Sequence, residues 1–304
     1  MKKRIVYPLM MASIIGSGAL LVSSNNSEKY SGSITAEAAT YDSADVIKNI
    51  DSEKINVQNL MLNSIDNFKT AKGSFTYYSN SGKYNLNVEY NVNLTENPKS
   101  YEKVQSLEFN SKDNSFKKAS FEPGYEESLY DGNSFTKSRS ADNQINGLAR
   151  SADAQTSTVE ARPATKEERE FKKGTTMEER IEKMPGGEKA YIKRVDPSLM
   201  GIAKTSLFPE DIAMGLLENT DSWNITGEGN ISGIKTFVIQ GKLNNDYATR
   251  YNAQDFELEV DQKTGILLVF KAIDSNGNVK ESIITNEIEL NSVLDSSSFK
   301  LSNN

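Results

Sequence analysis

The sequence predicts an α+β fold in which a large antiparallel sheet is covered on one face by a few helices. Residues 223–301 contain short apolar runs separated by tight-turn sequences, which is typical of a meander of antiparallel strands. A second run of strands is expected upstream, where residues 83–94 alternate polar and apolar side chains without a break. Apolar residues at helical spacing precede each run, and they predict the helical cover.

The first 38 residues have the composition of a secretory signal peptide. Lys2, Lys3 and Arg4 precede an apolar run over residues 5–22, and Ala36-Glu-Ala38 offers a small-x-small cleavage site. The alternatives are cleavage nearer the end of the apolar run, or an anchor that is retained, because ~20 apolar residues span a bilayer. We expect an exported protein, extracellular or associated with the cell envelope, with the segment cleaved rather than retained. Residues 39–304 would then form one domain.

The first half of this domain is expected to begin with a helix and to continue as strands. Helical spacing of apolar side chains predicts a helix over residues 57–71, with Gly73 at its C-terminal cap. The strands that should follow lie around residues 75–77, 83–94, 101–109, 115–121 and 127–135.

A charged segment over residues 138–195 separates the two runs of strands. Thr165-x-x-Glu168 and Thr175-x-x-Glu178 have the pattern of capping boxes, and Pro185-Gly-Gly187 is a helix stop. The segment has few apolar residues to offset the entropy lost on ordering. We therefore expect a mobile insertion with one or two short surface helices.

Two helices are expected between this insertion and the meander. Asp196-Pro197 opens the first helix, and Pro209 opens the second. Both carry apolar residues at helical spacing, so both should pack on the sheet.

The strands of the meander should bury one face each. Apolar residues alternate with Glu257 and Glu259 in the strand over residues 256–260. The last strand, over residues 281–290, is expected to place Ile284 with Ile288 on one face. Its acidic residues, Glu281, Glu287 and Glu289, fall on the other face.

The composition excludes several classes of active site. The chain has no histidine and no cysteine, which removes Ser-His-Asp triads, Cys-His pairs and imidazole or thiolate metal sites. The glycines of residues 227–229 do not stand between a strand and a long helix, so a phosphate loop is not expected. We expect no enzyme, no metal and no cofactor. A formal net charge of −7 argues against nucleic acid as a partner and favours neutral or acyl-type ligands over phosphate-rich ones.

An apolar cavity between the sheet and its helices is the candidate binding site. The sheet has a long apolar face, whereas the helices available to cover it are few and short. Incomplete cover would leave a groove for an acyl chain or for an apolar segment of another protein. A closed core in a structural secreted or surface protein is the alternative. The cavity candidates are Leu86, Val88, Tyr90, Leu199, Met200, Leu207, Leu216, Phe237, Ile239, Phe256, Leu258, Val260, Phe270, Ile284 and Ile288.

The order of these motifs resembles the LolA/LolB and RseB/MucB superfamily, whose members include outer-membrane lipoprotein-sorting proteins. The signal region resembles those of Gram-positive bacteria. The chain has no cysteine and therefore no lipobox, unlike the lipid-anchored members of the superfamily. The resemblance covers most of residues 44–301 outside the charged insertion. The sequences that carry it are Lys72-Gly-Ser-Phe-Thr-Tyr77, Tyr130-Asp-Gly-Asn133, Gly227-Glu-Gly-Asn-Ile-Ser-Gly-Ile234, Leu258-Glu-Val-Asp261, Thr264-Gly-Ile-Leu267, Asp274-Ser-Asn-Gly277 and Phe299-Lys-Leu301.

What the resemblance implies is a half-open curved antiparallel sheet, an incomplete barrel, with helices over its concave face. The implied role is non-catalytic binding of a lipid, acyl chain or lipoprotein-like ligand in the apolar cavity. The alternative is regulation of envelope-stress signalling through a membrane-bound regulatory protein of the anti-sigma factor type. Contact with a membrane surface would be peripheral in either case.

Overall fold

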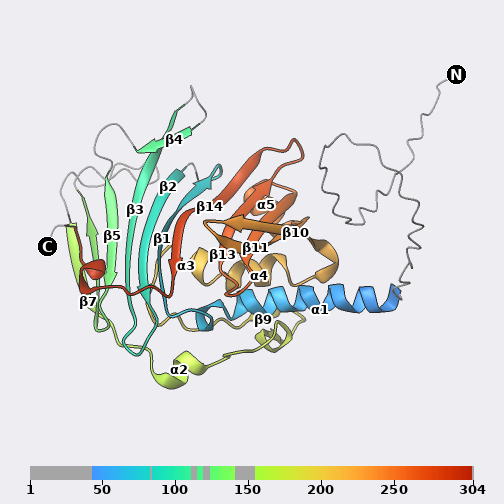
Figure 1. Ribbon diagram of the computed structural model, residues 1–304, viewed down its shortest axis with the longest axis horizontal. Coiled ribbons are helices and arrows are strands. Elements are labelled where there is room, and N and C mark those ends of the chain that lie inside the picture. The colour runs from blue at the N-terminus through green and yellow to red at the C-terminus, as the bar shows by residue number, and fades with distance from the viewer. Residues whose placement is uncertain (1–42, 83, 111–114, 119–123, 141–154, 303–304) are drawn as a thin grey trace, which may run out of the picture. The chain divides into compact units, whose positions relative to one another are not determined.

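The computed structural model contains one large antiparallel sheet built from both predicted runs of strands (Figure 1). The structure describes residues 43–302 except 83, 111–114, 119–123 and 141–154. The predicted signal peptide, residues 1–38, lies outside the described residues. In the described part of the chain, none of the helices has the length and apolar character needed to cross a membrane.

The first run of strands forms one end of the sheet. The alternating segment is one strand, and Val88 pairs with Phe75 on one side and Val104 on the other, so three apolar side chains share one face. The strands of this run are β1 (Thr70–Ser79), β2 (Tyr84–Asn93), β3 (Lys99–Asn110), β4 (Ser115–Lys118), β5 (Tyr125–Tyr130), β6 (Ser134–Arg139) and β7 (Gln155–Glu160).

The second run forms the other end, and β14 joins it to the first by pairing with β1. Gly73 lies opposite Ile288 in this pairing, which connects residues more than two hundred positions apart. The strands of this run are β10 (Trp223–Ile231), β11 (Ile234–Lys242), β12 (Asp255–Asp261), β13 (Leu267–Ile273) and β14 (Val279–Leu290).

The main path of the sheet has eleven strands and does not close into a barrel. Its order is β10-β11-β12-β13-β14-β1-β2-β3-β5-β6-β7, with β4 attached to β3 only. Over the residues described, the end strands β10 and β7 are not paired with each other. The predicted fold class, an open curved antiparallel sheet with a few helices, is confirmed.

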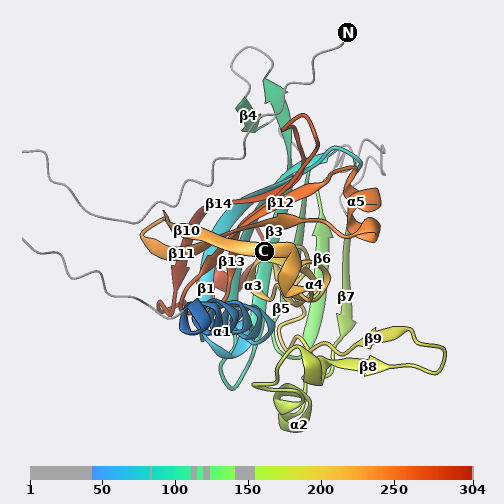
Figure 2. The same ribbon diagram turned by 90° about the vertical axis from the view of Figure 1, so that its right-hand side faces the viewer.

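The helices α3 (Lys204–Leu207) and α4 (Glu210–Leu216) lie within the curve of the sheet, and α1 (Ser43–Leu62) runs beside them with its N-terminal part extending beyond the strands (Figures 1 and 2). The helix predicted over residues 57–71 is wrong in its bounds, because α1 ends at Leu62 and the 3-10 helix η1 (Ser64–Asp66) follows. A tertiary contact fixes the point where α1 ends, because the Ser64 hydroxyl donates to the carbonyl of Leu207 at 2.9 Å. Gly73, expected as a helix cap, lies in β1.

Two further elements accompany the meander. The unpredicted helix α5 (Asn245–Tyr251) lies between β11 and β12, and the Asn244 side chain caps it by accepting from the Tyr247 N–H. The 3-10 helices η4 (Thr220–Ser222) and η5 (Ser296–Phe299) precede and follow the meander. The Asn91 side chain of β2 donates to Ser298 of η5 at 3.0 Å, which ties the end of the chain to the sheet.

The charged segment contains more regular structure than the one or two surface helices expected. Strand β7 extends the sheet, and α2 (Lys166–Glu170), η3 (Glu178–Arg180), β8 (Ile181–Lys183) and β9 (Lys189–Tyr191) follow it. The capping box at Thr165 and Glu168 is confirmed. The second predicted box is wrong by one residue, because Thr176 pairs with Glu179. The mobility of the charged segment stays a prediction.

The two ends of the sheet differ in what covers the concave face. From β10 to β2 that face is mainly apolar and lies against helices. On β5 and β6 the same face carries ion pairs, in which Glu126 binds Lys137 and Arg139. All six residues of β7 are exposed. The apolar interior therefore occupies only one part of the sheet.

Candidate functional site

The apolar concave face brings most of the predicted cavity residues together. In the registers of β11, β12 and β13, Ile239 lies opposite Leu258, and Leu258 lies opposite Phe270. Phe237 is half-buried and packs on the same core. Twelve of the predicted residues are buried in this one cluster: Leu86, Val88, Tyr90, Met200, Leu207, Leu216, Ile239, Phe256, Leu258, Val260, Phe270 and Ile288.

Residues 198–217, which we call the cover, lie over this face together with α1. Leu207 and Leu217 of the cover are fully buried, as are Met61 and Leu62 of α1. Over the described residues the face and the cover are in contact, so the interior is closed there and the groove expected from incomplete cover is not found. A ligand would reach the concave face only if the cover moved.

Polar side chains attach the cover to the sheet at defined points. The Glu102 carboxylate of β3 accepts from the N–H of Ile202 at 3.0 Å and of Ala203 at 2.6 Å. Burial raises the pKa of the Glu102 carboxyl, and these two donors oppose that shift. On the other side, the Ser206 hydroxyl donates to the carbonyl of Leu267 in β13 at 2.8 Å. The cover is thus held by side-chain hydrogen bonds, whereas strands are held by continuous ladders.

Leu199 does not belong to the apolar interior, and its prediction as a cavity residue is wrong. It is 39% exposed and has a positive φ of 51°. The Asp196 carboxylate accepts from the N–H of Ser198 at 2.8 Å and of Met200 at 2.9 Å, which folds this stretch into a turn. The first predicted helix therefore begins only at Lys204, and Leu199 points outward from the turn.

The sequence predicted Ile284 on the wrong face of the sheet, because a β-bulge reverses the alternation in β14. Ser74 lies opposite Glu287, but Phe75 lies opposite Thr285, so Asn286 is the extra residue. Upstream of the bulge Ile283 faces the core, and Ile284 lies on the outer face, opposite Val269.

The same bulge turns Glu281 inward, although it was expected among the outward acidic residues. Glu281 is buried and accepts a hydrogen bond from the hydroxyl of Tyr77 at 2.8 Å. Burial raises the pKa of the Glu281 carboxyl.

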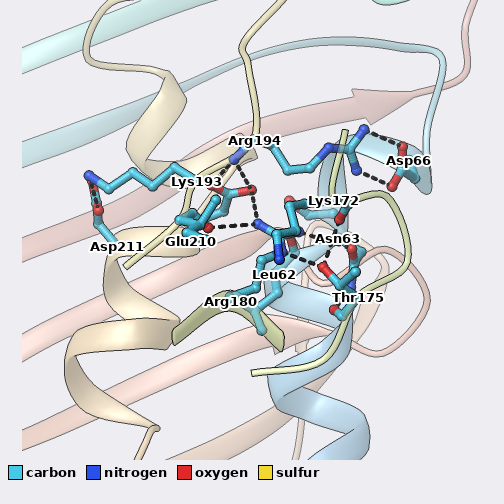
Figure 3. Close-up of polar contacts among 12 residues, drawn as sticks. Leu62, Asn63, Asp66, Lys172, Thr175, Arg180, Lys193, Arg194, Glu210 and Asp211 are labelled. Atoms are coloured by element: carbon cyan, nitrogen blue, oxygen red, sulfur yellow. Dashed lines mark hydrogen bonds and ion pairs between the residues drawn. The ribbon is translucent and has the colours of Figure 1, made fainter. Parts of the chain in front are cut away.

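A buried polar cluster fixes the charged segment to the helices, and the sequence did not indicate it. The Arg180 guanidinium is fully buried, pairs with Glu210 of α4 at 3.2 Å, and donates to the carbonyl of Leu62 at 3.2 Å (Figure 3). It also donates to the side chains of Asn63 and Thr175.

Arg194 extends this cluster. Its backbone N–H donates to Glu210 at 3.0 Å, and its guanidinium holds Asp66 with two bonds of 2.5 and 3.1 Å (Figure 3). Together the two arginines connect the end of α1, the charged segment and α4.

Several grooves lie on the described surface. One groove, of about 750 Å³, lies between α1 and the β8–β9 hairpin, with Ile55, Met177 and Ile181 in its lining. No group of three acidic, histidine or cysteine residues able to hold a metal ion occurs within the described ranges.

No family model matches this sequence, and no curated protein sequence matches it. Solved structures resemble the chain at low sequence identity. The MucA/MucB complex of Pseudomonas aeruginosa shares 12% identity with a TM-score of 0.41, over 82% of this chain and 62% of that chain. The lipoprotein LppX of Mycobacterium tuberculosis shares 8% identity with a TM-score of 0.37, over 81% and 98%.

An outer-membrane lipoprotein-sorting protein domain of Vibrio parahaemolyticus shares 7% identity with a TM-score of 0.26, over 82% of this chain and 96% of that chain. The chain spans less than two thirds of the length of the MucB structures it matches. The solved structures that resemble this chain thus include MucB and a lipoprotein-sorting domain, the two groups that the sequence resemblance named.

Proposed function

We propose that this chain is a non-catalytic extracytoplasmic binding protein whose apolar concave face takes an acyl chain of a lipid or an acylated protein when the cover moves. The observation that carries the proposal is that the apolar face is long, since it continues from β10 to β2, whereas the helices of the cover are short. Helix α3 has four residues and α4 has seven. Helices this short are not stable by themselves and depend on their contacts with the sheet.

The closed interior sets the energetics of this proposal. A ligand that binds only the open state has an apparent affinity reduced by the fraction of molecules that are open. The side-chain bonds of Ser206 and Glu102 exist only in the closed state, so they oppose binding. The acyl chain offsets this cost by burying apolar area, which contributes ~0.8 kcal/mol for each methylene group.

We expect the folded protein to bind an apolar fluorescent probe, and long-chain acyl compounds to displace it. Affinity should rise several-fold with every two carbons, because each methylene group adds ~0.8 kcal/mol until the face is filled. Displacement titrations with fatty acids of increasing length measure this. An absence of probe binding, or affinities independent of chain length, contradicts the acyl-binding proposal.

Loosening the cover should strengthen binding. Ser206→Ala removes a buried hydrogen bond worth ~1 kcal/mol that only the closed state makes, so the apparent probe affinity should rise about fivefold. Ser222→Ala is the matched control, because it removes the exposed bond from Ser222 to the carbonyl of Asn219 and leaves the cover intact. Probe titrations of both variants test this. Equal affinities for Ser206→Ala and wild type would mean that the cover does not open.

A second candidate function is regulation through a protein partner, and strand β7 favours it. All six residues of β7 are exposed, and among the described strands it pairs only with β6. Such an edge presents backbone N–H and C=O groups to which a strand of a partner could pair. This candidate takes precedence if the probe titrations fail.

A further inference from the structure

A pocket of about 580 Å³ lies where α2, η1 and residues 194–197 meet the end of β2. Its lining includes the cationic side chains of Lys166, Arg169, Lys173 and Arg194. The net charge of the whole chain is −7, so this collection of cations is a local departure from an acidic average. The average charge argued against anionic ligands, but a binding site responds to the charges that line it.

Among the described residues, three of these cations have no partner of opposite charge. Lys166, Arg169 and Lys173 form no ion pair in the part of the chain that the structure describes. The nearby acid Glu168 is already engaged, because it pairs with Arg162 and completes the capping box of α2. The three cations are therefore available to a ligand in the pocket.

Arg194 supplies a second, independent observation. It is 7% exposed, lines the pocket, and is fixed in place by its two bonds to Asp66 and one to the carbonyl of Arg169. Its Nε is buried and has no hydrogen-bond partner in the described part of the chain. Buried donors in folded proteins are almost always satisfied, so an oxygen ligand reaching this nitrogen would remove an unfavourable feature.

The balance of charge in the pocket favours a ligand with one negative charge. Besides the four cations, the lining carries the carboxylates of Asp66, Glu96 and Glu170. Asp66 is neutralised by Arg194, whereas Glu96 and Glu170 are exposed and would repel a second negative charge. Arginine guanidinium groups match the geometry of carboxylate and phosphate oxygens.

The apolar part of the lining connects this pocket to the interior. Ile65 and Leu94 line the pocket, and both pack against the apolar core. We propose that the pocket binds the monoanionic head group of an amphiphile, a phosphodiester or a carboxylate, whose chain runs along Ile65 and Leu94 toward the concave face. The anion site stands on the pocket alone, while the path of the chain rests on the proposed acyl-binding function.

Three ligands separate the head group from the chain. Lysophosphatidylglycerol carries one anionic phosphodiester and one acyl chain, monoacylglycerol of the same chain length has no charge, and glycerophosphoglycerol is the head group without a chain. Calorimetric titrations below the micelle concentration should show lysophosphatidylglycerol binding about tenfold more tightly than monoacylglycerol. The triple variant Lys166→Gln/Arg169→Gln/Lys173→Gln should lose this preference and keep its affinity for monoacylglycerol.

The matched control is Lys235→Gln/Lys263→Gln/Lys300→Gln, which removes the same charge from exposed lysines outside the pocket. It should keep the tenfold preference. A preference that persists in the pocket variant, or that falls equally in the control, overturns the anion site.

The outcomes also test the anion site separately from the proposed acyl-binding function. Monoacylglycerol binding with no preference for the charged ligand contradicts the anion site and leaves acyl binding supported. Binding of glycerophosphoglycerol that needs the pocket cations, with no gain from adding a chain, supports a free-anion site and contradicts acyl binding.

Discussion

Arg180→Ala is expected to lower the free energy of unfolding by ~3 to 5 kcal/mol, the usual loss when one partner of a buried ion pair is removed. Arg180 is fully buried, and its partner Glu210 retains only the backbone N–H of Arg194 as a donor after the change. The carbonyl of Leu62, at the end of α1, loses a donor as well. Urea denaturation followed by circular dichroism measures the loss.

The neighbouring pair of Lys193 and Asp211 is the matched control (Figure 3). Its side chains are 48% and 64% exposed, so Lys193→Ala should cost less than ~1 kcal/mol. The double variant Arg180→Met/Glu210→Leu should recover much of the stability, since apolar pairs often replace buried ion pairs without loss. A cost for Arg180→Ala no greater than that of Lys193→Ala would show that the cluster does not hold the charged segment.

The contrast between Arg180 and strand β2 explains how far the sequence could predict this fold. The alternation over residues 83–94 is a local property, and it predicted a strand that the structure places at Tyr84–Asn93. Arg180 stands in a segment rich in charges, where a solvated side chain is the ordinary expectation. Its burial depends on Glu210 and Leu62, which lie 30 and 118 residues away in the chain. Contacts at such separations leave no periodic signal.

The end of α1 shows the same limit within a helix. Helical spacing continues from Val57 to Phe68, and the prediction followed it past the true end of the helix. The chain leaves the helix at Asn63 because Arg180 and the carbonyl of Leu207 bind Asn63 and Ser64 there. The burial of the apolar strand residues was accordingly predicted well, and their role as a binding site stays a prediction. The residues that attach the helices and the charged segment, Glu102, Ser206 and Arg180, were not predicted.

The bulge in β14 is a third kind of limit, because one extra residue reverses a whole alternation. The sequence placed Ile284 inward, and the register with β1 places Ile283 there instead. Substituting Ile283 and Ile284 in turn therefore distinguishes the bulged register from the unbulged one. Each variant changes the same residue type in the same strand, so β-propensity and local sequence are matched.

Ile283→Asp is expected to leave the protein unfolded at 25 °C, while Ile284→Asp should cost ~1 to 2 kcal/mol. Ile283 is 1% exposed in the apolar interior, so the change loses ~1.5 to 3 kcal/mol of burial and places a carboxylate there at a cost of several kcal/mol more. That total is comparable to the ~5 to 15 kcal/mol that stabilises an ordinary domain. Ile284 lies half-buried on the outer face, where its aspartate would keep contact with water.

Circular dichroism spectra and thermal melts of the two variants decide between the registers. If Ile283→Asp folded and Ile284→Asp did not, the result would support a strand without the bulge, in which Glu281 lies on the outer face. The expected opposite result keeps the Glu281 carboxylate beside the Tyr77 hydroxyl inside the sheet. The concave face would then carry one polar pair within its apolar lining, which limits how far an acyl chain can extend toward that end of the sheet.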